Sequence, residues 1–152
     1  MIRLLLVEDD AEISAIICNY LKQLEEYEIY TANDIDSAQS FLNQIFDVIL
    51  LDVMLPGGNG IQLCEQFRKI QKCPILFISC INDDQIIFDA LSHGGDDYIT
   101  KPFNNIILDA RIKANLRRVN LDKEKTILSE KSYGLLKINQ DGKSISFRGK
   151  NM

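Results

Sequence analysis

The sequence predicts an α/β protein built on a doubly wound parallel sheet, and two observations lead to this fold class. Short continuous apolar runs at residues 4–7, 48–51 and 75–78 are typical of strands buried on both faces. Segments in which apolar residues recur at helical spacing separate these runs. The alternation predicts five strands and five helices up to about Val119, joined by right-handed crossovers.

The remaining elements follow from the same patterns. Residues 28–32 alternate between apolar and polar side chains, which suits an edge strand, and residues 98–100 form a short fifth strand. Gly94 and Gly95 end the fourth helix in the manner of a C-cap. The expected helices are Ile13 to Leu24, Ala38 to Ile45, Cys64 to Ile70, a less regular one at 84–93, and Leu108 to Val119.

The chain changes character after Val119. Residues 120–132 are polar and lysine-rich, which predicts a linker or a fraying extension of the last helix. Within 133–152, short apolar runs flank Asp141-Gly142, which predicts a β-hairpin that begins a small antiparallel platform. We therefore expect a domain at 1–119, a linker at 120–132 and a β fragment at 133–152.

Composition narrows the class of protein. Residues 1–119 carry 18 acidic and 10 basic side chains, and residues 120–152 carry 4 and 7, so the acidic body has a basic tail. That tail fits either an attached nucleic-acid module or a solvated surface. The apolar runs are far shorter than the roughly 18 residues of a membrane span, and no signal peptide is recognisable, so we expect a cytoplasmic protein. The four cysteines lack zinc-site spacing.

Five polar side chains stand at the ends of predicted strands. Glu8 and Asp9 follow the first strand, Asp52 the third, Ser79 the fourth and Lys101 the fifth. Because ligands bind beyond the carboxyl ends of parallel strands, we expect the five to share one pocket. Carboxylate oxygens suit Mg²⁺, and a carboxylate is a possible phosphoryl acceptor. An ammonium and a hydroxyl would then contact the phosphoryl oxygens.

Each of these residues also has an ordinary structural explanation. The acidic run Glu8-Asp9-Asp10 would cap the first helix, because acidic side chains favour helix N-termini. Asp52 and Lys101 would be solvated charges, and Ser79 would be a turn hydroxyl. The placement of all five at matching strand ends favours the metal and phosphoryl site over these separate explanations. Lys101-Pro102 is, in addition, a candidate cis peptide bond.

Four motifs carry a family resemblance: Val7 to Asp10, Leu51 to Gly57, Ile78-Ser79 and Asp96 to Phe103. Over residues 2–119 they resemble the receiver domain of two-component response regulators. The last motif, with Ala110 to Ile112 and Leu116 to Arg118, is similar to the OmpR/PhoB subfamily, and the tail from Tyr133 resembles the opening of its winged-helix DNA-binding domain. The resemblance implies a flavodoxin-like (βα)5 fold with strand order 2-1-3-4-5 in a C-terminally truncated regulator.

The resemblance implies a chemical role for the acidic residues. Asp52 would accept a phosphoryl group from a sensor histidine kinase. Asp9 and Asp52 would bind Mg²⁺, with Glu8 acting through water and Met54 through its backbone carbonyl. The protein would be a signalling phosphoacceptor rather than an enzyme, although it would assist its own phosphorylation and dephosphorylation.

The resemblance also implies a switch and a dimer. Ser79 and Lys101 would bind the phosphoryl oxygens, and Tyr98 would turn inward when Ser79 moves toward the phosphate. The fourth helix, fifth strand and fifth helix would then pair two copies symmetrically. DNA would be bound only through the missing part of the C-terminal domain, and no membrane partner is expected. The residues expected on the dimer face are Ile87, Asp96, Asp97, Ile107, Arg111 and Arg118.

Two residues of that face depart from the family pattern. Ile87 and Ile107 stand where the family usually has a basic residue and a glutamate that form a salt bridge between subunits. An apolar contact would replace this ion pair and would be less sensitive to salt. The alternative for Ile87 is local packing within its own subunit.

There are three alternatives to this function. A flavin-binding protein would need small polar residues after the first strand, whereas this chain has three acidic residues. A phosphatase with an aspartate nucleophile would need a second aspartate where Met54 stands. A receiver that dimerises without phosphate is the remaining alternative.

Overall fold

The computed structural model describes residues 1–131, with side chains described up to residue 121. The hairpin predicted within 133–152 lies outside the described residues. Met1–Leu116 forms one compact unit, and the chain from Arg117 onward belongs to a second. The segment predicted as a linker, or as a helical extension, is helical up to Lys131.

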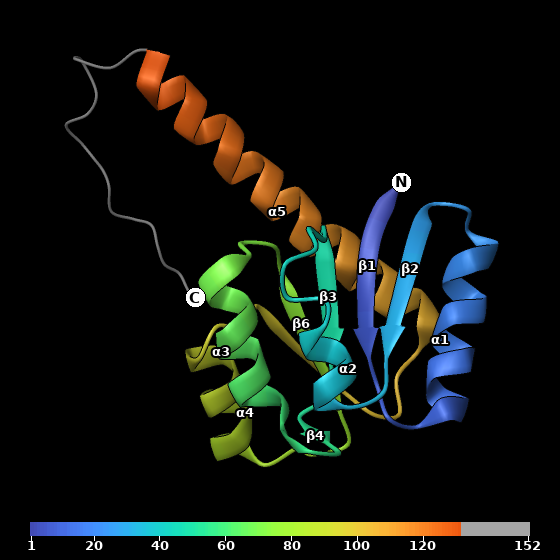
Figure 1. Cartoon of the computed structure of the whole chain (residues 1–152). Coiled ribbons are helices and arrows are strands. Elements are labelled where there is room, and N and C mark those ends of the chain that lie inside the picture. The colour runs from blue at the N-terminus through green and yellow to red at the C-terminus, as the bar shows by residue number, and fades with distance from the viewer. Residues whose placement is uncertain (132–152) are drawn as a thin grey trace. The chain divides into compact units, whose positions relative to one another are not determined.

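Five parallel strands form the main sheet in the order β2-β1-β3-β6-β7 (Figure 1). This confirms the predicted order 2-1-3-4-5, because β6 and β7 are the fourth and fifth strands of that sheet. A small antiparallel hairpin of β4 and β5 follows β3. The strands are β1 Ile2–Val7, β2 Tyr27–Ala32, β3 Val48–Leu51, β4 Met54–Leu55, β5 Gly58–Asn59, β6 Ile75–Ser79 and β7 Asp97–Thr100.

Helices cover both faces of the main sheet, as Figure 1 shows. Leu4 and Leu6 of β1 belong to one buried cluster, and Leu5 and Val7 belong to the other, which explains why the run is continuously apolar. Helices α1 and α5 contribute to the first cluster, and helices α2, α3 and α4 contribute to the second. The helices are α1 Ala11–Gln23, α2 Ile35–Gln39, α3 Gly60–Ile70, α4 Asp84–Ser92 and α5 Asn105–Lys131.

Helix α1 is capped by the third acidic residue after β1. Asp10 Oδ1 accepts the backbone N–H groups of Glu12 at 2.9 Å and Ile13 at 3.2 Å. Such an N-cap satisfies donors that have no partner within the helix. Because Asp10 alone makes these capping contacts, Glu8 and Asp9 are left for the pocket at the end of the strand.

The prediction that the second helix reaches Ile45 is wrong, because α2 ends at Gln39. Residues 40–44 form turns instead, and their backbone groups are held by a side chain from the end of α3. The amide of the buried Gln71 donates to the carbonyls of Leu42 and Gln44, and its oxygen accepts the N–H of Phe46. The apolar spacing looked helical because Phe41 packs on the core from a turn.

Replacing Gln71 with leucine is expected to lower the free energy of unfolding by about 2–4 kcal/mol, since the buried backbone groups that it binds would lose their partners. Gln62→Leu on the exposed side of α3 is the matched control and is expected to change stability by less than about 0.5 kcal/mol. Urea denaturation of both variants checks this, and equal stability of the two would contradict it.

Candidate functional site

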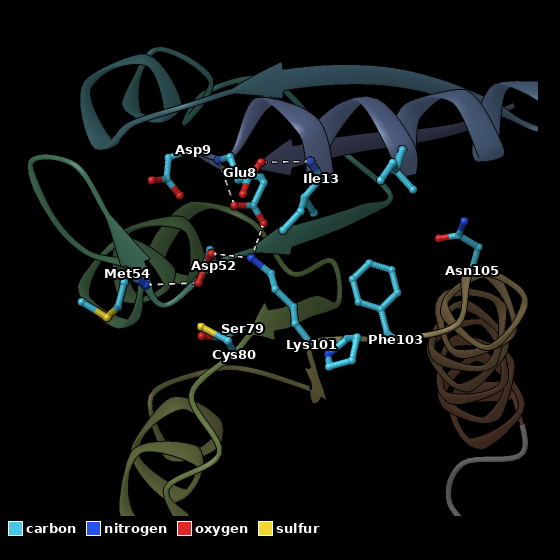
Figure 2. A pocket seen from close by; sticks show the side chains of 13 residues that line it. Glu8, Asp9, Ile13, Asp52, Met54, Ser79, Cys80, Lys101, Phe103 and Asn105 are labelled. Carbon is cyan, nitrogen blue, oxygen red and sulfur yellow. Dashed lines mark hydrogen bonds and ion pairs between the residues drawn. The ribbon is translucent and has the colours of Figure 1, made fainter.

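The five strand-end side chains converge at the carboxyl edge of the main sheet. Glu8 and Asp9 follow β1, Asp52 follows β3, Ser79 ends β6, and Lys101 follows β7. All five line one pocket of about 660 Å³ (Figure 2). The structure therefore brings together every side chain that the sequence places at these strand ends.

Three carboxylates in this pocket are close enough to share a cation. Ligand atoms of Glu8, Asp9 and Asp52 lie within 4.8 Å of one another. Glu8 and Asp52 are buried, with exposed fractions of 3% and 7%, whereas Asp9 is exposed. Mg²⁺ prefers oxygen ligands and retains several waters, so this donor set fits the ion. Met54, which was expected to offer its backbone carbonyl, also lines the pocket.

The ammonium of Lys101 bridges two of these carboxylates (Figure 2). Its Nζ lies 2.7 Å from Glu8 Oε1 and 3.0 Å from Asp52 Oδ2. Burial opposes the charge on Lys101, but its contacts with Glu8 and Asp52 outweigh burial and raise its pKa. Burial also opposes the charge on Glu8 and therefore raises its pKa, and the hydrogen bond from Lys101 counteracts that rise. The Lys101–Pro102 peptide bond is cis, as the sequence suggested.

Ser79 and Tyr98 hold the same residue of the loop after β6. Ser79 is buried, and its Oγ accepts the N–H of Ile81 at 3.2 Å. The hydroxyl of Tyr98 donates to the carbonyl of Ile81 at 2.7 Å. Burial raises the pKa of the Tyr98 phenol, and the nearby Ser79 hydroxyl acts in the opposite direction. The two predicted switch residues are therefore coupled through one backbone segment beside the pocket.

The acidic residues of the predicted dimer face have partners within the chain. Asp96 Oδ2 lies 2.8 Å from a guanidinium nitrogen of Arg68 and accepts the N–H of Ile75 at 2.9 Å. Asp97 pairs with Arg111 at 2.9 Å. Any pairing of Asp96 or Asp97 across a dimer would therefore compete with a contact that already exists.

The apolar residues of that face are more open. Ile107 at the start of α5 is 50% exposed, and on α4 Phe88 is 65% and Leu91 is 41% exposed. Ile87 is partly buried, which fits either local packing or a contact with a partner. Arg118 is exposed on the part of α5 that belongs to the second unit.

Sequence reasoning missed one residue that positions the phosphoacceptor candidate. Gly60, the first residue of α3, donates its N–H to the carbonyl of Val53 at 2.6 Å. A Cβ added to Gly60 would lie 1.9 Å from the backbone oxygen of Asp52. The glycine therefore lets α3 start directly against the end of β3. A cluster of glycines such as Gly57, Gly58 and Gly60 indicates a turn but does not indicate this contact.

The pocket also has an apolar side that the strand-end pattern did not indicate. Ile13 and Ile16 of α1 and Phe103 after β7 line it, and Figure 2 shows Phe103 on the side of the pocket away from Asp9. Ile16 is 50% exposed. The pocket therefore extends from the acidic cluster to apolar side chains of α1.

The family of the chain follows from comparison with known proteins. The model of the response regulator receiver domain matches residues 4–113. The chain belongs to this family. A receiver domain is a signalling part of regulatory proteins rather than a classical enzyme, so the match favours a signalling role over the flavin-binding and phosphatase alternatives.

The curated relatives of this receiver domain are transcription regulators of the OmpR/PhoB type. The chain is 38% identical over 126 residues to the transcriptional regulatory protein SpaR of Bacillus subtilis, covering 83% of this chain and 57% of SpaR. It is 40% identical over 122 residues to the phosphate regulon regulator PhoB of Escherichia coli, covering 78% of this chain and 53% of PhoB. The chain thus spans about half the length of these relatives.

Solved receiver structures share the fold. A two-component response regulator from Clostridium difficile matches with a TM-score of 0.75 and 35% identity, covering 79% of this chain and 99% of that one. The BeF3-activated receiver domain of RstA from Klebsiella pneumoniae matches with a TM-score of 0.70 and 30% identity, covering 76% and 98%. Within residues 1–131, no helix has the length and apolar character to cross a membrane.

Proposed function

We propose that Asp52 accepts a phosphoryl group from a sensor histidine kinase in a Mg²⁺-dependent reaction, and that this modification switches the receiver. The observation that carries the proposal is the contact of Lys101 with Asp52 in a pocket that also contains Glu8 and Asp9. A fixed cation beside a carboxylate nucleophile suits a transferring group that carries negative charge. The family match supports the same role.

The chemistry assigned to Asp52 is nucleophilic. One of its carboxylate oxygens attacks phosphorus, an O–P bond forms, and the N–P bond to the kinase histidine breaks, which leaves an acyl phosphate. Mg²⁺ would neutralise charge on the transferring group while held by Asp9, Asp52 and the Met54 carbonyl, with Glu8 acting through water. Hydrolysis of the acyl phosphate in the same pocket would return the receiver to its starting state.

Two side chains would hold the product. Lys101 now contacts Asp52 Oδ2, and it would transfer this contact to an oxygen of the new phosphoryl group. Ser79 would donate its hydroxyl hydrogen to another phosphoryl oxygen. Because Ser79 and Tyr98 both bind the backbone of Ile81, a shift of Ser79 would move Ile81 and so change the position of Tyr98. The altered surface of α4, β7 and α5 would then bind a second copy of the chain.

The switch would act by dimerisation. In a longer protein with a DNA-binding domain after this receiver, paired receivers would bring two such domains together and so control transcription, as the names of the relatives suggest. Sedimentation of the chain with Mg²⁺ and a small acyl phosphate tests this, with a dimer expected for the parent and a monomer for Asp52→Asn. A dimer of equal affinity in both proteins would instead support the phosphate-independent receiver.

Ile107 is expected to lie at an apolar centre of that dimer. Ile107→Glu should weaken dimerisation of the phosphorylated chain by about tenfold or more, because the interface would have to desolvate a carboxylate. Ile106→Glu is the matched control, since Ile106 is the neighbouring residue of α5 and is also exposed. The parent dimer should be nearly insensitive to added salt. Equal dimerisation of both glutamate variants would contradict this role of Ile107.

A further inference from the structure

Phe77 lies beside the predicted switch tyrosine, on the neighbouring strand. It is fully buried in β6, and its register partner on β7 is Tyr98. The two rings are stacked, with centroids 6.1 Å apart and an interplanar angle of 28°. Offset stacking of this kind favours one orientation of the pair over others.

The space for the Phe77 ring exists because Gly95 has no side chain. A Cβ added to Gly95 would lie 2.7 Å from Phe77 Cε2 and 2.9 Å from Phe77 Cδ2. It would also lie 2.9 Å from the carbonyl oxygen of Ala90, so backbone closes the other side. A methyl group at Gly95 would therefore have to displace a fully buried ring, which has few alternative positions in a packed core.

Direct contacts continue from Tyr98 to the pocket. The Tyr98 hydroxyl holds the carbonyl of Ile81, and the Ser79 hydroxyl holds its N–H. Ser79 in turn lines the pocket that contains Asp52. Gly95, Phe77, Tyr98, Ile81 and Ser79 thus form one uninterrupted series of contacts, although Phe77 and Gly95 themselves do not line the pocket.

We infer that Phe77 is a positioning residue of the switch, because its ring, admitted by Gly95, supports Tyr98 in the orientation in which the hydroxyl reaches Ile81. The inference rests on the proposed function for its consequence, which is that Phe77 sets the balance between the two positions of Tyr98. Without the ring, Tyr98 would lose its stacking surface, and the hydroxyl contact alone would have to hold it.

The experiment uses the complete chain and two variants with the same chemical change. Phe77→Leu removes the ring that stacks on Tyr98. Phe46→Leu removes a buried ring that packs on Tyr30 and Phe41 instead. Nuclear Overhauser contacts between the Tyr98 ring and Ile81 are measured without phosphodonor, and Tyr98→Phe serves to assign the signals. We expect the contacts to weaken severalfold in Phe77→Leu and to persist in Phe46→Leu. Unchanged contacts in folded Phe77→Leu would overturn the inference.

A double-mutant cycle keeps the test independent of folding defects. Gly95→Ala should displace the Phe77 ring, and leucine at position 77 should make room for the added methyl group. The Gly95→Ala/Phe77→Leu variant should therefore retain more stability than the sum of the single changes predicts. Additive effects would show that the two positions do not interact, which would contradict the inference.

Phosphorylation separates this inference from the proposed function. Phe77→Leu should accept a phosphoryl group at close to the parent rate, because Phe77 lies outside the pocket. Phosphorylation should, however, strengthen dimerisation of Phe77→Leu severalfold less than it strengthens dimerisation of the parent. Failure of the parent itself to be phosphorylated would refute the proposed function, and the Overhauser contacts would still decide the role of Phe77. Full coupling of phosphorylation to dimerisation in Phe77→Leu would refute that role alone.

Discussion

Gly60→Ala is expected to slow phosphorylation of Asp52 by about 100-fold, because small displacements of a reacting group are costly. The new Cβ would lie 1.9 Å from the Asp52 carbonyl oxygen and 3.0 Å from Val53 Cα. Both are backbone atoms, so no side-chain rotation relieves the clash. Either α3 or the end of β3 must move, and Asp52 would then leave its place opposite Lys101. The free energy of unfolding should fall by about 1–3 kcal/mol as well.

Gly58→Ala provides a matched control in the same loop. A Cβ there would lie 3.4 Å from the nearest atom, which belongs to the Ile35 side chain, so the change should be tolerated. Rates of phosphorylation by a small acyl phosphate and urea denaturation are measured for both variants. Equal rates for Gly60→Ala and Gly58→Ala would show that close approach of α3 does not position Asp52.

Lys101→Met is expected to lower the free energy of unfolding by about 3 kcal/mol near pH 8, because two buried carboxylates would lose the cation between them. The same change should abolish or strongly slow phosphorylation, since no ammonium would meet the phosphoryl oxygens. Added Mg²⁺ should restore part of the stability by taking over the charge balance of Glu8 and Asp52. Lys72→Met, at an exposed lysine, is the control.

The effect of Lys101→Met on stability should depend on pH. Lys101 now lowers the pKa of Glu8, so its removal raises that pKa further. A carboxyl group whose pKa is raised in the folded state binds its proton more tightly there than in the unfolded state. The stability that this bound proton contributes is lost as pH rises through the folded pKa. The stability lost in Lys101→Met should therefore be smaller near about pH 5 than near about pH 8. Denaturation at both values checks this, and a loss that grows on acidification would contradict it.

The strand ends could be predicted from the sequence because each depends on local pattern. The apolar run before Asp52 identifies a buried strand, and parallel strands bring their carboxyl ends to one edge. That argument placed Asp52, Ser79 and Lys101 in one pocket without any measured distance, and the structure agrees. It did not indicate that Lys101 contacts Glu8 as closely as Asp52.

The parts that could not be predicted depend on contacts between distant segments. Helix α2 ends at Gln39, and Gln71, some thirty positions later in the chain, binds the carbonyls of Leu42 and Gln44 in the turns that follow. Gly60 and Gly95 look like ordinary turn residues, and only the positions of Asp52 and Phe77 show why a side chain does not fit. Such requirements arise from tertiary packing and leave no periodic signal.

The intact mass of the protein after incubation with Mg²⁺ and a small acyl phosphate tests the central claim most directly. We predict that the parent gains the mass of one phosphoryl group, and that Asp52→Asn and the parent with Mg²⁺ chelated gain none. No gain under any condition, or a gain that persists in Asp52→Asn, would contradict the assignment of Asp52 as the phosphoacceptor.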